Sequence, residues 1–262
     1  MDSQRLSTGI GALDSLLGGG FTRGGTYLFS GAPGTGKTIA CLQFVLAGLK
    51  QEEKAVYVTV DERPAEILDS AASLAWNLQP YIQDKKLVIL DASPYFGGRA
   101  GGGGEKGIDP QKIVADLGNY VKRLGATLLI IDPVTPLILP PDATSPSQDQ
   151  ARSLLQLIQT QINTTNILTA HLSAGALHGA ASGIEEYLAA GVLVFNSREI
   201  HDRFERTLTI KKMRGAAVQP KSYQFTLERE KGIVIDDAVG KTVNQTAAPQ
   251  MFEFFDIDKK PS

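Results

Sequence analysis

The chain has very little cysteine. Cys41 is the only one among 262 residues, so an internal disulfide is excluded and we expect a small buried apolar side chain there. No apolar run approaches the roughly 20 residues of a membrane-spanning helix, and the first residues lack the charged-then-apolar pattern of a secretory signal. A formal net charge of −2 argues against a strongly basic nucleic-acid-binding protein. We therefore expect a cytoplasmic protein without membrane insertion.

Glycine, by contrast, is abundant with 27 residues, and residues 31–38 match the P-loop pattern G-x-x-x-x-G-K-[ST]. Glycines let the backbone fold tightly, so that its N–H groups converge on phosphate oxygens. Lys37 would reach the outer phosphates, and the Thr38 hydroxyl would hold Mg²⁺. A β-prone run before the loop and a helical pattern after it give the strand–loop–helix context that the motif requires. The predicted nucleotide site includes Gly31, Ala32, Pro33, Gly34, Thr35, Gly36, Lys37, Thr38 and Ile39.

Strands and helices alternate through the first two thirds of the sequence. Apolar β-prone runs predict strands at residues 26–30, 55–60, 87–91, 127–131 and 166–170. Helical patterns lie between them at residues 38–51, 64–78, 110–124 and 148–161. This alternation is typical of an α/β fold in which helices flank a mainly parallel sheet on both faces.

The pattern changes from Gly191 onward. Strands are expected at residues 192–196, 206–213, 222–226 and 232–235 with no helices between them. We interpret them as an antiparallel extension of the same sheet, not as a second domain. The sequence thus predicts a single domain over residues 1–236 and a polar C-terminal tail over residues 237–262.

Carboxylates end two of the predicted strands. Residues 128–132 read Leu-Leu-Ile-Ile-Asp, the form of a Walker B strand in which Asp132 faces Mg²⁺. Asp61 and Glu62 follow the strand after the P-loop helix, and either could polarise a water molecule for attack on the γ-phosphate. The alternative is that they merely cap the helix beginning near Pro64.

His171 and a cationic run, residues 211–215, allow two readings each. His171 ends the strand beside the Walker B strand, where it could sense the phosphate or anchor a loop. Lys212 and Arg214 could be a cationic finger supplied to the nucleotide of the next subunit, or they could belong to a solvated edge strand. His178 and His201 have no partners at ligand spacing, so we expect no metal other than Mg²⁺.

Three segments have loop composition: the glycine-rich insertion 97–107, and the loops 140–148 and 173–183. The last two follow predicted strands and contain neither lysine nor arginine, which argues against a DNA-binding role.

From Arg5 to about Ile235, the chain resembles the RecA-fold ATPases and, within them, the KaiC family. The likeness rests on four ordered stretches, at residues 7–20, 56–69, 87–94 and 206–215. It implies a RecA-like core, Mg-ATP bound at subunit interfaces, and a hexameric ring in which Lys212 and Arg214 reach the neighbour's phosphates. The nucleotide site that we predict with this resemblance also includes Ser73, Lys212, Met213 and Arg214.

The sequence departs from the KaiC pattern in several places. The clock protein has two tandem domains and a phosphorylated Ser/Thr pair, whereas this chain has one P-loop domain and no convincing counterpart of the pair, so autokinase activity is not predicted. Asp61 and Glu62 occupy the positions of two paired glutamates in the KaiC family, and His171 occupies the position of another glutamate. Residues 216–218, Ala-Ala-Val, replace Thr-Ser-His, which would remove contacts to the neighbour's nucleotide. Slow turnover is the expectation.

The leading hypothesis is an oligomeric Mg-dependent ATPase that regulates an unknown protein partner. Glu62, with or without Asp61, would orient water, Lys37 would bind the phosphates, and the in-trans pair would complete the site. A nucleotide-gated interaction module with little hydrolysis is the alternative. A RecA-like DNA recombination or repair ATPase is a third reading, which the absence of cations in the loops disfavours.

Overall fold

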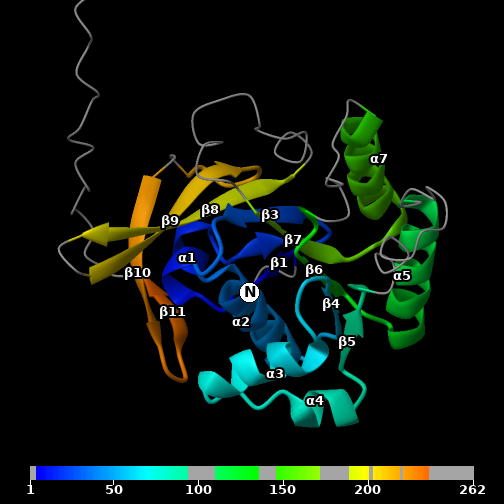
Figure 1. The fold of residues 1–262 in the computed structure, drawn as a ribbon, viewed down its shortest axis with the longest axis horizontal. Coiled ribbons are helices and arrows are strands. Elements are labelled where there is room, and N and C mark those ends of the chain that lie inside the picture. The colour runs from blue at the N-terminus through cyan, green and yellow to red at the C-terminus, as the bar shows by residue number, and fades with distance from the viewer. Residues whose placement is uncertain are drawn as a thin grey trace, which may run out of the picture.

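The computed structural model describes residues 4–93, 110–135, 146–171, 189–200, 203–218 and 221–235. Its centre is a nine-stranded sheet with the order β11-β10-β9-β8-β3-β7-β6-β4-β5 (Figure 1). The glycine-rich insertion, most of loop 140–148, loop 173–183, His178, His201 and the predicted tail from residue 237 lie outside the described residues. The division into a domain and a tail therefore stays a prediction.

The parallel part of the sheet confirms the expected α/β arrangement. It consists of β3 (Thr26–Gly31), β4 (Ala55–Thr59), β5 (Leu87–Asp91), β6 (Leu128–Asp132), β7 (Thr165–His171) and β8 (Gly191–Ile200). Every pair of neighbours among these strands is parallel. Most of their residues are buried, because helices cover both faces of the sheet.

The antiparallel extension begins one strand later than the sequence suggests. β8 was expected to be its first member, but it runs parallel to β3 and places Leu28 opposite Val192. The antiparallel strands are β9 (Arg203–Met213), β10 (Lys221–Glu228) and β11 (Gly232–Ile235). A long connection leads from β7 to β8, and such a connection permits a parallel crossover that a tight hairpin does not.

The two faces of the sheet carry separate hydrophobic cores. Alternate residues of β3 show the division: Tyr27 and Phe29 pack in one core, and Leu28 packs in the other. The first core is completed by α1 (Gly11–Leu16), α2 (Lys37–Lys50) and α3 (Pro64–Ser73). The second lies under α5 (Pro110–Leu124) and α7 (Pro146–Gln161), which lie side by side (Figure 1). Cys41 is fully buried in the first core, as expected.

Some short elements depart from the sequence prediction. The helix expected over residues 64–78 ends at Ser73, and α4 (Gln79–Gln83) follows it. Ala75 adopts a left-handed conformation with φ 61° between the two helices, and the Trp76 amide donates to the Ala71 carbonyl. The N-terminal segment adds a small sheet, β1 (Arg5–Leu6) paired with β2 (Phe21–Thr22). Among the described residues, no helix has the length and apolarity to span a bilayer.

Candidate active site

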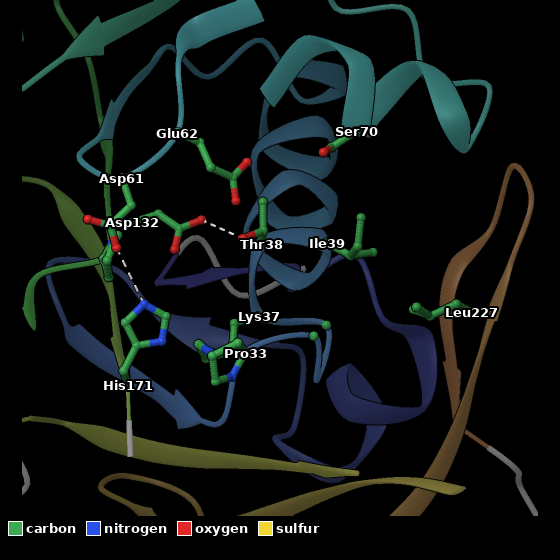
Figure 2. Close-up of a pocket in the computed structure, with 13 residues that line it drawn as sticks. Pro33, Lys37, Thr38, Ile39, Asp61, Glu62, Ser70, Asp132, His171 and Leu227 are labelled. Carbon is green, nitrogen blue, oxygen red and sulfur yellow. Dashed lines mark hydrogen bonds and ion pairs between the residues drawn. The ribbon is translucent and has the colours of Figure 1, made fainter. Parts of the chain in front are cut away.

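A cavity of about 350 Å³ opens at the carboxyl edge of the parallel strands, where β3, β4, β6 and β7 end (Figure 2). This edge is where open α/β sheets bind their ligands. The residues that line it are Pro33, Gly34, Gly36, Lys37, Thr38, Ile39, Asp61, Glu62, Ser70, Asp132, Pro133, His171 and Leu227.

The P-loop forms the floor of the cavity and leads into α2. Gly36 precedes the helix with φ 102°, a backbone conformation that residues with a Cβ atom rarely adopt. Gly31 is required for a different reason, because a Cβ there would lie 2.2 Å from the Phe195 carbonyl oxygen on β8. The loop therefore packs close to the sheet and presents the N-terminus of α2 to the cavity, as an anion-binding site requires.

Lys37 folds back onto its own loop. Its ammonium group donates to the carbonyl oxygens of Gly31 and Ala32, each at 2.9 Å, and the residue is only 6% exposed. Burial lowers the pKa of Lys37, while the negative charge of Asp132 opposes that shift. A phosphate in the cavity would offer this partly desolvated ammonium a charged partner in place of neutral carbonyls.

Asp132, at the end of β6, is buried and accepts hydrogen bonds from three hydroxyl groups. Thr38 Oγ1 donates to its Oδ2 at 2.8 Å, and the Tyr57 hydroxyl donates to the same oxygen at 2.6 Å. Thr169 Oγ1 donates to Oδ1. The predicted metal residues Thr38 and Asp132 are thus in contact, and their hydroxyl and carboxylate oxygens are the kind of donors that Mg²⁺ prefers.

Glu62 and Asp61 lie at the upper rim of the cavity, and their side chains diverge (Figure 2). Glu62 points towards the side where Thr38 lies. Partial burial raises the pKa of the Glu62 carboxyl, and the negative charges of Asp132, Glu66 and Asp61 add to the shift.

Asp61 turns instead towards His171. Its Oδ2 lies 3.5 Å from His171 Nε2, and both side chains remain partly exposed. The backbone amide of His171 donates to Thr135 Oγ1 at 2.9 Å. At the start of α3, it is the Glu66 carboxylate that accepts the hydrogen bond from the Arg63 amide, at 2.7 Å. The capping role considered for the two rim carboxylates is therefore filled by another residue.

Several predicted residues do not line this cavity. Ser73 is exposed and donates to the Ser70 carbonyl at 2.7 Å, and Ser70, one helical turn earlier, lines the cavity instead. Gly31, Ala32 and Thr35 belong to the loop but do not line the cavity. The other predicted residues that do not line it are Lys212 and Met213 at the end of β9, and Arg214 just beyond it.

Besides the cavity-lining serine just described, sequence reasoning missed four residues of the site. Leu227 and Pro133 line the cavity, and the hydroxyl groups of Tyr57 and Thr169 donate to Asp132. Pro133 follows the Walker B aspartate directly, so its position could have been inferred. Leu227 comes from β10 and depends on how the antiparallel strands fold over the P-loop helix, which no local pattern specifies.

A P-loop between β3 and α2, with an aspartate at the end of β6 beside it, defines a P-loop nucleotide-binding domain with a RecA-like sheet. The family model described as "ATPase: KaiC" matches residues 6–239, and the chain belongs to the KaiC ATPase family. The resemblance inferred from the sequence is confirmed.

Comparisons with individual proteins support the same family assignment. The circadian clock oscillator protein KaiC of Parasynechococcus marenigrum is 31% identical over 228 residues, which cover 87% of this chain and 44% of that protein. The UPF0273 protein MK0039 of Methanopyrus kandleri is 31% identical over 241 residues, which cover 90% of this chain and 93% of that protein. The crystal structure of the KaiC-like protein PH0186 of Pyrococcus horikoshii matches with a TM-score of 0.73 and 29% identity, covering 88% of this chain and 98% of that one. The chain thus spans less than half the length of the clock protein.

Proposed function

We propose that this chain is a Mg²⁺-dependent ATPase whose active site is completed by a neighbouring subunit in a ring, with a hexamer as the expected size. The observation that supports the proposal best is the convergence of Lys37, Thr38, Asp132 and Glu62 on one cavity at the P-loop. Nucleotide hydrolysis would change the conformation of the ring and thereby its contacts with a protein partner in the cytoplasm.

Each residue has a role that follows from its position. Lys37 and the N-terminus of α2 bind the β- and γ-phosphates, and Thr38 with Asp132 would hold Mg²⁺. The cation supplies positive charge that offsets the negative charge developing on the phosphate oxygens. Glu62 orients the attacking water, because its carboxyl faces the cavity and its raised pKa makes it a better proton acceptor than an ordinary glutamate. Asp61 faces His171 instead.

The charge of the cavity supports a contribution from a second subunit. Lys37 is the only lysine or arginine among the described residues that line it. Phosphoryl transfer commonly needs a further cation at the γ-phosphate, and Lys212 and Arg214 do not line the cavity of their own chain. We therefore propose that the two side chains serve the site of the adjacent subunit.

Two substitutions test the proposal. Lys37→Ala removes the phosphate-binding ammonium and is expected to abolish ATP binding. Glu62→Gln should keep ATP affinity within about twofold and reduce turnover by on the order of 10²–10⁴-fold, the usual contribution of a general base. Binding is measured by calorimetry and turnover by phosphate release. ATP binding at wild-type affinity in the lysine variant would refute the assignment of the cavity.

A second function is supported by residues 216–218. Ala216 and Val218 pack against the core of their own subunit. Because alanine and valine have no polar side-chain atoms, these positions offer a neighbour's nucleotide no hydrogen bond from a side chain. This favours a nucleotide-gated interaction module that binds ATP with little hydrolysis. The rate per chain as a function of protein concentration distinguishes the two: a rate that rises and saturates supports the ATPase, and bound ATP with a negligible rate throughout supports the module.

A further inference from the structure

The hydroxyl groups around Asp132 come from three different elements. Thr38 belongs to α2, Tyr57 to β4 and Thr169 to β7, and together they donate to both oxygens of the carboxylate. The sheet order β7-β6-β4 explains the arrangement, because Asp132 ends the middle strand and each flanking strand contributes one hydroxyl. The orientation of this buried carboxylate is therefore set from both sides of β6.

Tyr57 is the most constrained of the three donors. It is 1% exposed, its ring packs in the core formed with α2, and it is not among the described residues that line the cavity. Its hydroxyl lies 2.6 Å from Asp132 Oδ2. Burial and the adjacent negative charge raise the pKa of the Tyr57 phenol well above its ordinary value, so the group remains a donor. Because the Tyr57 hydroxyl is buried, no water could replace Asp132 as its acceptor, and losing this hydrogen bond would be energetically costly.

Thr38 differs from Tyr57 because it also faces the cavity. In the proposed function the Thr38 oxygen is a ligand of Mg²⁺, so the position of this hydroxyl depends on the bound cation. Tyr57 donates to the same carboxylate oxygen, but its side chain is buried and is not among the described residues that line the cavity. Its hydrogen bond can persist in both the empty and the loaded site.

We propose that Tyr57 is a positioning residue that fixes the Asp132 carboxylate in the orientation needed for Mg²⁺–nucleotide binding. The inference rests on the proposed function, because it assumes that Asp132 serves a cation. Hydrogen-bonding partners of metal-associated carboxylates commonly change metal affinity by about 10- to 100-fold when they are removed.

The test is Tyr57→Phe, which removes the hydroxyl and keeps the ring. Affinity for a fluorescent ATP analogue is measured with excess Mg²⁺ and again with EDTA. For the variant we expect about a tenfold smaller gain in affinity on adding Mg²⁺, at the low end of the usual range. Affinity in EDTA should be unchanged, because Lys37 and the P-loop do not depend on the tyrosine hydroxyl.

Tyr27→Phe is the matched control. Tyr27 is also 1% exposed and lies in the same core, and its hydroxyl bonds with the backbone of Thr22, away from the cavity. Tyr27→Phe should lower the free energy of unfolding without changing the effect of Mg²⁺ on nucleotide affinity. Thr169→Val removes the donor to the other oxygen of Asp132 and should reduce the effect of Mg²⁺ as Tyr57→Phe does. Thr169→Ser keeps a hydroxyl and should show the wild-type effect of Mg²⁺. This pair also serves if the Tyr57 variant does not fold.

The outcomes separate this inference from the function on which it rests. If Mg²⁺ does not tighten nucleotide binding in the wild-type chain, the proposed metal site itself is wrong. If Mg²⁺ acts on the wild type and acts equally, or more strongly, on folded Tyr57→Phe, the positioning role is wrong and the metal site stands. The same holds if Tyr27→Phe changes the effect of Mg²⁺ as much as Tyr57→Phe does.

Discussion

Glu62 and Glu66 stand four residues apart, and their environments shift their pKa values in opposite directions. Partial burial raises the pKa of Glu62, with Asp132 as the next cause. The Arg63 amide and then the Arg63 side chain lower the pKa of Glu66 by hydrogen bonding to its carboxylate. Ionised Glu62 therefore destabilises the fold, as expected for a catalytic group. Ionised Glu66 stabilises the start of its helix.

These opposite shifts predict opposite effects on stability. Because the folded-state pKa of Glu62 is raised, its contribution is full below the ordinary glutamate pKa and declines as the pH rises through the raised value. Glu62→Gln should therefore increase the melting temperature at neutral pH, by no more than about 2 °C for a solvent-accessible group. The increase should shrink as the pH is lowered. Thermal scans without nucleotide at several pH values provide the measurement.

Glu66→Gln is the control with the opposite sign. Its lowered pKa means that it stabilises the fold above the ordinary glutamate pKa and loses this contribution as the pH falls. The variant should melt at a lower temperature than the wild type at neutral pH, and the difference should vanish in acid. If Glu62→Gln lowers the melting temperature at neutral pH as Glu66→Gln does, the environment assigned to Glu62 is wrong.

At the scale of elements, a buried glutamine connects the P-loop helix with two distant segments. The Gln43 amide, on α2, donates to the Gly9 carbonyl at 2.8 Å and to the Lys231 carbonyl at 2.9 Å. Its oxygen accepts from the Ile233 amide at 2.8 Å. Gly232 is required beside it, because a Cβ at that position would lie 2.5 Å from the Gln43 side-chain oxygen. This contact fixes β11 against the helix that carries Lys37 and Thr38.

Gln43→Leu should therefore destabilise the protein strongly. The substitution leaves buried backbone donors and acceptors without partners, and each such group costs about 1–3 kcal/mol, so a loss of roughly 2–4 kcal/mol is expected. The free energy of unfolding is measured by denaturant titration. Gln156→Leu, at an exposed position on α7, should change it by less than about 0.5 kcal/mol. Equal losses in the two variants would contradict the role given to Gln43.

Elements with a strong local pattern were predictable from the sequence, and those without one were not. β5 and α5 have the bounds that periodicity indicated. The end of α3 at Ser73 depends on a left-handed Ala75, a conformation that no alanine signals. Short strands such as β1, of two residues, carry no periodicity at all.

The same limit applies to the site. The P-loop and Asp132 follow from motifs that encode their own geometry. Ser73 was assigned to the nucleotide site, yet Ser70 lines the cavity, since a shift of one helical turn leaves the sequence pattern unchanged. The hydroxyl of Tyr57 reaches Asp132 only through the pairing of β4 with β6, which is a property of the sheet.

At the scale of the whole molecule, the proposed finger residues lie near the amino end of β3, whereas the P-loop follows its carboxyl end. Lys212 pairs with Val192 near the end of β9, and the Arg214 amide donates to the Ala190 carbonyl at 2.7 Å. Neither residue lines the cavity of its own chain. The proposed function therefore requires a ring in which the same head-to-tail contact between subunits brings this end of β9 beside a neighbour's P-loop.

Mixing two inactive variants tests this arrangement. Lys37→Ala lacks a working P-loop but keeps the finger, and the double variant Lys212→Ala/Arg214→Ala has the opposite defect. In a randomly mixed ring, about one quarter of the heterologous interfaces would join an intact P-loop to an intact finger, so about a quarter of the wild-type ATPase rate should return. Lys211→Ala should remain active, because the proposed finger consists of Lys212 and Arg214 alone. If mixed rings form, as shown by co-purification of differently tagged subunits, and no activity returns, Lys212 and Arg214 do not act in trans.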